Sequence, residues 1–266
     1  MAVIYRKEIL QDITFFTSAP KAQFYDKLFL NLDLSDFPES TAKTGRNGFS
    51  QRALLCAFII MKCECFSCIT DLVDYLNNNL IIAHYCGFNI MKPLPSYWTF
   101  DRFIRKLDNA FLKKLMQSQV LKLSEMGIID TSFIALDSTP VNANTRQNNP
   151  KSFAKNKFSK DNQPKSDKDC GLGVHTASNQ HNERNFEYYW GYKNHILVDC
   201  ITGLPIYELI TSANVSDSTV ALDILSQTNS FLSVDECTFL ADKGYDVKAI
   251  YNTVKAVSYT HLTLPT

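Results

Sequence analysis

The chain of 266 residues is long enough for one or two domains. Hydrophobic residues make up 45% and charged residues 20%, which excludes a wholly disordered chain. With 27 basic and 27 acidic residues the formal charge is zero, so any nucleic-acid site must rest on a local basic patch. We find neither a secretory signal nor an apolar run of the ~20 residues that span a bilayer. Together with eight cysteines, this predicts a cytoplasmic protein with reduced thiols and no membrane partner.

Helices dominate the prediction for the first half of the chain. Apolar periodicity predicts helices at residues 51–62, 70–78, 96–107 and 110–127, with only weak helical character over residues 5–37. Ser50 and Ser96 stand where they can cap two of these helices. We therefore expect a helical N-terminal domain over residues 1–128.

Three basic residues, Arg102, Arg105 and Lys106, share one face of the helix predicted at 96–107. A basic helix face suits a phosphate backbone, so this helix is a candidate DNA-recognition helix. A solvated basic face on an ordinary amphipathic helix is the commoner alternative when the pattern is taken alone.

A cysteine cluster, Cys63, Cys65 and Cys68, lies at the end of the helix predicted at 51–62. Its C-x-C-x2-C spacing does not match the usual zinc-ligand patterns, and cysteine also acts as a small hydrophobic residue. We expect no zinc site here.

A mixed sheet is predicted for the second half. Short apolar runs predict strands at residues 132–136, 192–199, 204–211 and 237–241, with helices at 216–225 and 246–255. The turn signal Thr202-Gly203 predicts that the second and third strands form a hairpin. The fold class expected is α/β, with the strand and helix order β-β-β-α-β-α after the helical domain.

A long polar insertion, residues 142–190, separates the first two predicted strands. Loops of such length are usually functional or disordered. Its basic residues and the interleaved Phe153 and Phe158 are typical of a mobile segment that binds nucleic acid, and a solvated linker fits the charge pattern equally well. The candidate DNA-binding lysines of this insertion are Lys151, Lys155, Lys157 and Lys160.

Two acids, Asp137 and Asp242, each directly follow a predicted strand. Carboxylates from different strands can converge on Mg²⁺, which prefers oxygen ligands and completes its shell with substrate phosphate. Two such ions about 4 Å apart can activate water and stabilise a leaving 3′ oxygen in phosphodiester cleavage. On spacing alone, turn or cap acids would be the simpler interpretation.

Three segments in this order carry a family resemblance: DST at Asp137–Thr139, GYKNHILVDCITGLPIYELITSANVSDS at Gly191–Ser218 and ADKGYD at Ala241–Asp246. They resemble the DDE transposases of bacterial insertion sequences, especially the branch whose second acid lies in D-x-G-Y. Residues 46–107 are similar to the helical N-terminal domain of many such enzymes, and the resemblance covers roughly residues 45–255.

The resemblance implies an incomplete ribonuclease H-like catalytic domain over residues 129–256. It implies that Asp137 and Asp242 are the first two catalytic acids and bind two Mg²⁺ ions. It further implies cleavage of transposon-end DNA followed by strand transfer. Transposon terminal repeats and target DNA would be the partners, with a possible homodimer in the DNA complex.

The third acid of the family is missing. The family places it in Y-x2-R-x3-E, whereas here Tyr251 is followed three places later by Val254, and no acid follows Asp246. The final stretch VSYTHLTLPT, residues 257–266, resembles a translated sequencing-library adaptor. We therefore expect a C-terminally truncated transposase with an artefactual tail and no cleavage activity.

Two alternatives remain from the sequence. A truncated transposase could act as a non-catalytic DNA-binding inhibitor. A haloacid-dehalogenase-like phosphatase with Asp137 as nucleophile is the other, although Thr139 stands where that family has a second Asp.

Overall fold

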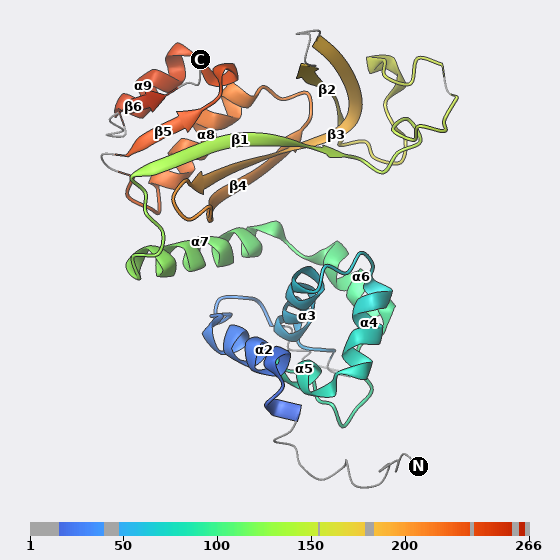
Figure 1. Cartoon of the computed structure of the whole chain (residues 1–266). Helices are drawn as coiled ribbons and strands as arrows, with labels where there is room; N and C mark the ends of the chain where they lie inside the picture. The colour runs from blue at the N-terminus through green and yellow to red at the C-terminus, as the bar shows by residue number, and fades with distance from the viewer. Residues whose placement is uncertain are drawn as a thin grey trace, which may run out of the picture. The chain divides into compact units, whose positions relative to one another are not determined.

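The computed structural model describes residues 16–39, 48–153, 155–178, 184–234, 237–256 and 261–263 (Figure 1). The chain forms two compact units, residues 1–115 and 116–266. Their division falls inside helix α7 (Asn109–Glu125). The reason is that α7 supplies both cores: Phe111, Leu112 and Leu115 pack in the first, and Met116, Val120 and Leu123 in the second.

The first unit is helical, as predicted. Its described helices are α2 (Pro20–Asn31), α3 (Gln51–Cys63), α4 (Ile69–Asn78), α5 (Leu80–Tyr85) and α6 (Tyr97–Lys106). With α7, they confirm the four predicted helices, and α2 lies in the stretch predicted as only weakly helical. Ser50 caps α3, since its Oγ accepts a hydrogen bond from the Ala53 N–H at 3.2 Å.

Glu64 joins three helices of this unit. It follows the end of α3 and accepts hydrogen bonds from Lys21 and Tyr25 of α2 and from Tyr75 of α4. Burial alone would raise the pKa of this carboxyl, but the hydrogen bonds and the Lys21 charge hold it below its ordinary value. The ionised carboxylate is therefore part of the packing of α2, α3 and α4.

The second unit is a mixed sheet with two helices between its strands (Figure 1). The strands are β1 (Phe133–Asn142), β2 (Gly171–Ser178), β3 (Arg184–Asp199), β4 (Pro205–Ser212), β5 (Thr238–Ala241) and β6 (His261–Thr263). Their order is β2-β3-β1-β5-β6, with β4 also paired to β3. Helix α8 (Asp217–Asn229) connects β4 to β5, and α9 (Lys248–Ala256) follows β5.

Strand directions complete the fold assignment. Strand β3 is antiparallel to β1 and β4, whereas β5 is parallel to β1 and β6 is parallel to β5. Helices followed by this mixed sheet confirm the predicted α/β class. The predicted hairpin is also present, because β3 and β4 are antiparallel neighbours around Thr202-Gly203.

One face of the sheet holds the core of the second unit. Along β1, Ile134 and Leu136 are buried, whereas Phe133 and Asp137 on the opposite face are exposed. Buried residues from α8 and α9 pack in the same core: Val220, Ala221, Ile224, Leu225, Ile250 and Val254. The alternation therefore places the first acid on the face away from this core.

The described part of the insertion, residues 142–153, 155–178 and 184–190, contains more secondary structure than its sequence predicts. Strand β1 runs on to Asn142, and β2 pairs with the first half of β3 as an antiparallel ribbon. Apolar periodicity does not predict this ribbon, because its cross-strand pair Val174 and Tyr188 is exposed. Backbone hydrogen bonds, which leave no pattern in the sequence, hold the two strands together. At its base Trp190 is buried, and its Nε1 donates to the Lys157 carbonyl at 2.8 Å.

The predicted artefactual tail, residues 257–266, contains β6, which the sequence did not predict. Strand β6 pairs with β5, with Leu262 opposite Phe239. Because edge pairing uses backbone groups, it places few demands on side chains. Across the described ranges of the chain, no helix has the length and apolar character to cross a membrane.

Candidate active site

The register of β1 and β5 brings the two predicted acids together. Leu136 and Ala241 are Cα partners in the parallel pair, and Asp137 and Asp242 are the residues that follow them. Neighbouring strands lie about 4.8 Å apart, so the two acids stand side by side where this pairing ends. Contrary to prediction, β1 does not stop at Asp137, because it remains paired with β3 as far as Asn142.

Backbone N–H groups orient both carboxylates. The Ser138 N–H donates to Asp137 Oδ1 at 2.7 Å, and the Gly244 N–H donates to Asp242 Oδ1 at 2.9 Å. A Cβ on Gly244 would lie only 3.0 Å from that same Asp242 oxygen, so glycine suits this close approach. Both acids are solvent-exposed and can be reached by a ligand.

The donor set of this site fits a hard divalent cation. Two adjacent carboxylates that face solvent can hold Mg²⁺ and leave room for water and substrate phosphate. In the described part of the chain, no group of three or more His, Cys, Asp or Glu side chains could hold a metal ion. The thiols of Cys63, Cys65 and Cys68 are exposed and not joined in disulfides.

A buried polar cluster lies on the core face of the same sheet. His195 of β3 is fully buried, with Nε2 2.9 Å from Thr211 Oγ1 and Nδ1 3.9 Å from Asp217 Oδ1. Lys193 Nζ donates to Asp217 Oδ1 at 2.8 Å and to the Val215 carbonyl at 3.1 Å. Burial is the main cause that lowers the pKa of His195, so its imidazole is neutral near pH 7.

Tyr245 also lies in the hydrophobic core of the second unit. It ends the short 3₁₀ helix η2 (Lys243–Tyr245) that follows Asp242, and only 2% of its surface is exposed. Burial raises its pKa most, and the negative charges of Asp217, Asp137 and Asp242 raise it further. Sequence reasoning missed Tyr245 and Asp217, although Tyr245 is the last residue of the D-x-G-Y motif and could have been found there.

The basic face predicted on the recognition helix lies on α6. Arg102, Arg105 and Lys106 are all exposed. Arg105 Nε donates to Asp101 Oδ2 at 2.9 Å, which offsets part of its charge. Arg102 and Lys106 line a shallow cavity of about 400 Å³ in the first unit, together with Phe103.

The candidate lysines of the insertion belong to the second unit. Lys151, Lys155 and Lys160 are exposed, whereas Lys157 is half-buried with Nζ 5.3 Å from the Phe158 ring centroid. Phe153 is 99% exposed, so its ring is free to contact a ligand. The loop therefore presents positive charge and one bare aromatic ring.

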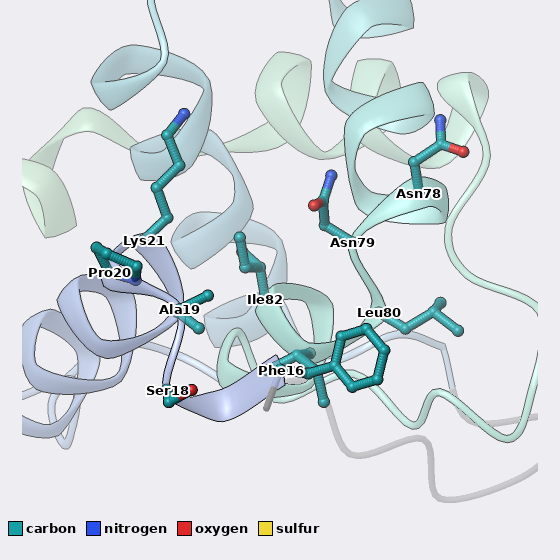
Figure 2. A pocket seen from close by; sticks show the side chains of 11 residues that line it. Phe16, Ser18, Ala19, Pro20, Lys21, Asn78, Asn79, Leu80 and Ile82 are labelled. Carbon is teal, nitrogen blue, oxygen red and sulfur yellow. The ribbon is translucent and has the colours of Figure 1, made fainter. Parts of the chain in front are cut away.

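A wider cavity of about 1010 Å³ lies in the first unit, where the start of α2 meets the junction of α4 and α5 (Figure 2). Phe16, Leu80 and Ile82 supply much of its apolar wall, and Lys21 is the one titratable side chain among the described residues that line it. Lys21 is already paired with Glu64. The described lining contains no acid, histidine or cysteine, the groups that acid–base or metal chemistry needs.

The mixed sheet thus carries two adjacent acids where its parallel strands β1 and β5 end. Residues 129–263 match the family model described as "Transposase DDE domain", and the chain belongs to this family. The match leaves the phosphatase alternative without support. No curated protein matches the sequence.

Solved transposase complexes are among the structures similar to this chain. The Mos1 mariner paired-end complex with Mn is 10% identical, with a TM-score of 0.28 over 91% of this chain and 67% of that chain. The Mos1 strand transfer complex is 11% identical, with a TM-score of 0.28 over 92% and 68%. The piggyBac transposase synaptic complex with hairpin DNA is 11% identical, with a TM-score of 0.37 over 91% and 46%.

Proposed function

We propose that this chain is the core of an insertion-sequence transposase of the D-x-G-Y branch. In this proposal Asp137 and Asp242 are the first two catalytic acids and bind Mg²⁺. The observation that carries it is the β1–β5 register, which sets the two acids side by side within a DDE transposase domain. Two bound Mg²⁺ ions would supply activation of water and stabilisation of the leaving 3′ oxygen.

Backbone groups of the chain orient the two carboxylates for this chemistry. The N–H groups of Ser138 and Gly244 fix one oxygen of each carboxylate, which limits the positions the acids can adopt. Exposure of both acids on the face away from the core leaves space for a DNA phosphate to approach. The site is thus arranged for a large anionic substrate.

We propose DNA as the partner, specifically transposon terminal repeats and target DNA. Arg102 and Lys106 on α6 and the insertion lysines Lys151, Lys155 and Lys160 are exposed and suited to phosphate contacts. A homodimer in the DNA complex, and action in the cytoplasm, belong to the same proposal.

We further propose that the polypeptide as given binds DNA but does not cleave it. No Asp or Glu follows Asp246, so a third carboxylate from a later helix is missing from the sequence. Residues 257–266 resemble an adaptor translation, and we propose that they are foreign to the protein.

The site is tested by Mn²⁺ binding, followed through the electron paramagnetic resonance signal of the free ion. Asp137→Ala and Asp242→Ala should each abolish measurable binding, because one carboxylate alone holds the ion poorly. Asp246→Ala, an exposed acid four residues after Asp242, is the matched control and should bind as the unmodified chain does. Binding that survives in both site variants would exclude the proposed metal site.

DNA binding and cleavage are tested on duplexes from the ends of the element that encodes the chain. We expect a mobility shift without Mg²⁺-dependent nicking. Arg102→Ala with Lys106→Ala should reduce the salt dependence of binding, by about 0.9 in slope for each DNA phosphate that is no longer neutralised. Lys27→Ala on α2 is the control for an exposed lysine outside this face. Nicking that disappears in Asp137→Ala would show that the chain is active as it stands.

A further inference from the structure

Asp137 and its two neighbours in β1 face opposite sides of the sheet. Asp137 is exposed, whereas Leu136 is buried and Ser138 is half-buried on the core face. Ser138 is the Cα partner of His195 on β3, so it borders the cluster of Lys193, His195 and Asp217. The residue next to the first acid therefore belongs to a polar layer on the reverse side of the site.

Tyr245, three residues after Asp242, lies next to this polar layer. Helix η2 packs against α8, whose first residue is Asp217. The Tyr245 hydroxyl is buried and forms no hydrogen bond of regular geometry with the residues that the structure describes, and the Ser138 side chain is the hydrogen-bonding group that acts on it. A buried hydroxyl without a hydrogen bond is unfavourable, so pairing with Ser138 would stabilise Tyr245 in this position.

The surroundings of this hydroxyl make it a neutral donor. Burial and three carboxylates, those of Asp217, Asp137 and Asp242, raise the pKa of Tyr245, and the side chain of Ser138 acts in the opposite direction. Asp217 is itself held by Lys193 at 2.8 Å. The hydroxyl thus lies near groups on β1 and α8 whose positions are already restrained.

We propose that Tyr245 is a positioning residue for the two-acid site. By pairing with Ser138 on β1, its buried hydroxyl fixes the segment after β5 against β1 and so sets the spacing of Asp137 and Asp242. This inference rests on the proposed function of those two acids. Divalent-ion affinity depends on such spacing, because the second shell orients the groups that bind the ion.

The experiment is Mn²⁺ titration of the full 266-residue chain by electron paramagnetic resonance. Tyr245→Phe keeps the ring and removes the hydroxyl, and it should raise the Kd for Mn²⁺ about tenfold, as second-shell changes do. Tyr207→Phe removes a hydroxyl from another buried tyrosine of the same core and should leave the Kd unchanged. Circular dichroism melting checks that both variants keep their folded domain.

A double-variant comparison distinguishes a positioning role of Tyr245 from a general effect on the stability of the domain. Ser138→Ala should weaken Mn²⁺ binding as Tyr245→Phe does, and the double variant should be no weaker than either single variant, since both break one connection. Ser138→Thr, which keeps a hydroxyl, should restore affinity. If Tyr245→Phe fails to fold, the Ser138→Ala and Ser138→Thr pair decides the question.

Asp137→Ala distinguishes a failure of the Tyr245 role from a failure of the two-acid metal site. If it abolishes Mn²⁺ binding while Tyr245→Phe and Ser138→Ala bind normally, the role of Tyr245 is overturned and the two-acid site stands. If Asp137→Ala binds Mn²⁺ normally, the site itself is overturned, and the positioning role with it.

Discussion

Asp199 secures the turn that reverses the chain between β3 and β4. It is fully buried, and its carboxylate accepts hydrogen bonds from the N–H groups of Asp130 and Ile201 and from the Thr202 hydroxyl. Burial would raise its pKa, but these hydrogen bonds outweigh burial and hold the pKa below the ordinary value. One carboxylate thus joins the start of β1 to the β3–β4 turn.

Asp199→Asn should lower the free energy of unfolding of the second unit by about 1–3 kcal/mol at pH 7, because one charged acceptor is removed. The folded pKa is depressed, so this contribution is present above the unfolded pKa near 4 and disappears as pH falls through the folded pKa. The variants should therefore converge in strongly acidic solution. Urea unfolding followed by Trp190 fluorescence, in a Trp98→Phe background, measures the difference.

Asp223→Asn, an exposed acid on α8, is the control for Asp199→Asn. It should change stability little at any pH. A difference between Asp199→Asn and the unmodified chain that stays constant down to acidic pH would contradict the role of the ionised carboxylate.

At the scale of single residues, the sequence could predict the positions of the two acids, but not the buried polar residues on the opposite face of the sheet. Asp137 and Asp242 directly follow apolar runs, so strand pattern alone places each at the end of a run. Asp217 and Tyr245 follow no apolar run, and although Tyr245 ends the D-x-G-Y motif, the motif does not reveal its neighbours, which come from β1 and α8. Contacts between segments far apart in sequence are set by packing, which periodicity does not contain.

Among the elements, the strongly amphipathic helices and the short buried strands were predictable. Each buries one face and leaves one polar, as α4 does with Leu72 and Leu76 buried. The β2–β3 ribbon was not predictable, because its exposed Val174, Phe186 and Tyr188 give no alternation of buried and polar positions. Strand β6 was not predictable either, because its three residues are too few to show a pattern.

The junction of α2, α3 and α4 at Glu64 gives a prediction at this scale. Glu64→Gln keeps the shape of the side chain but removes the ion pair with Lys21 and weakens the bonds from Tyr25 and Tyr75. We expect a decrease of about 1–2 kcal/mol in the stability of the first unit. Urea unfolding followed by circular dichroism at 222 nm, where its helices dominate, measures the decrease.

Asp74→Asn, an exposed acid on α4, serves as the control for Glu64→Gln. Equal effects of the two variants would mean that removal of negative charge, and not the junction, determines the result.

At the scale of the whole molecule, the described residues of each unit form a large core. Leu72 lies in the core of the first unit and Ile224 in that of the second, and both are fully buried. Each unit therefore carries apolar burial of its own, which is the physical requirement for independent cooperative unfolding.

Leu72→Ala and Ile224→Ala should each destabilise one unit by about 2–5 kcal/mol through cavity formation. Leu72→Ala should leave the Trp190 fluorescence transition in place and lower the midpoint of helix unfolding, whereas Ile224→Ala should lower the Trp190 midpoint. A shift of both transitions by either variant would show that the two cores unfold as one unit.

The β1–β5 register also determines which changes in chain length the protein can tolerate. The strands that carry Asp137 and Asp242 are joined by a long stretch of chain, yet the separation of the acids depends only on how the two strands pair. Removing one residue inside β5 would shift Asp242 by about 3.3 Å and turn it toward the opposite face. Insertions between Asn142 and Gly171, outside the paired strands, would leave the acids where they are. Homologues should therefore differ freely in the length of this insertion while the short strands before each acid keep a constant length.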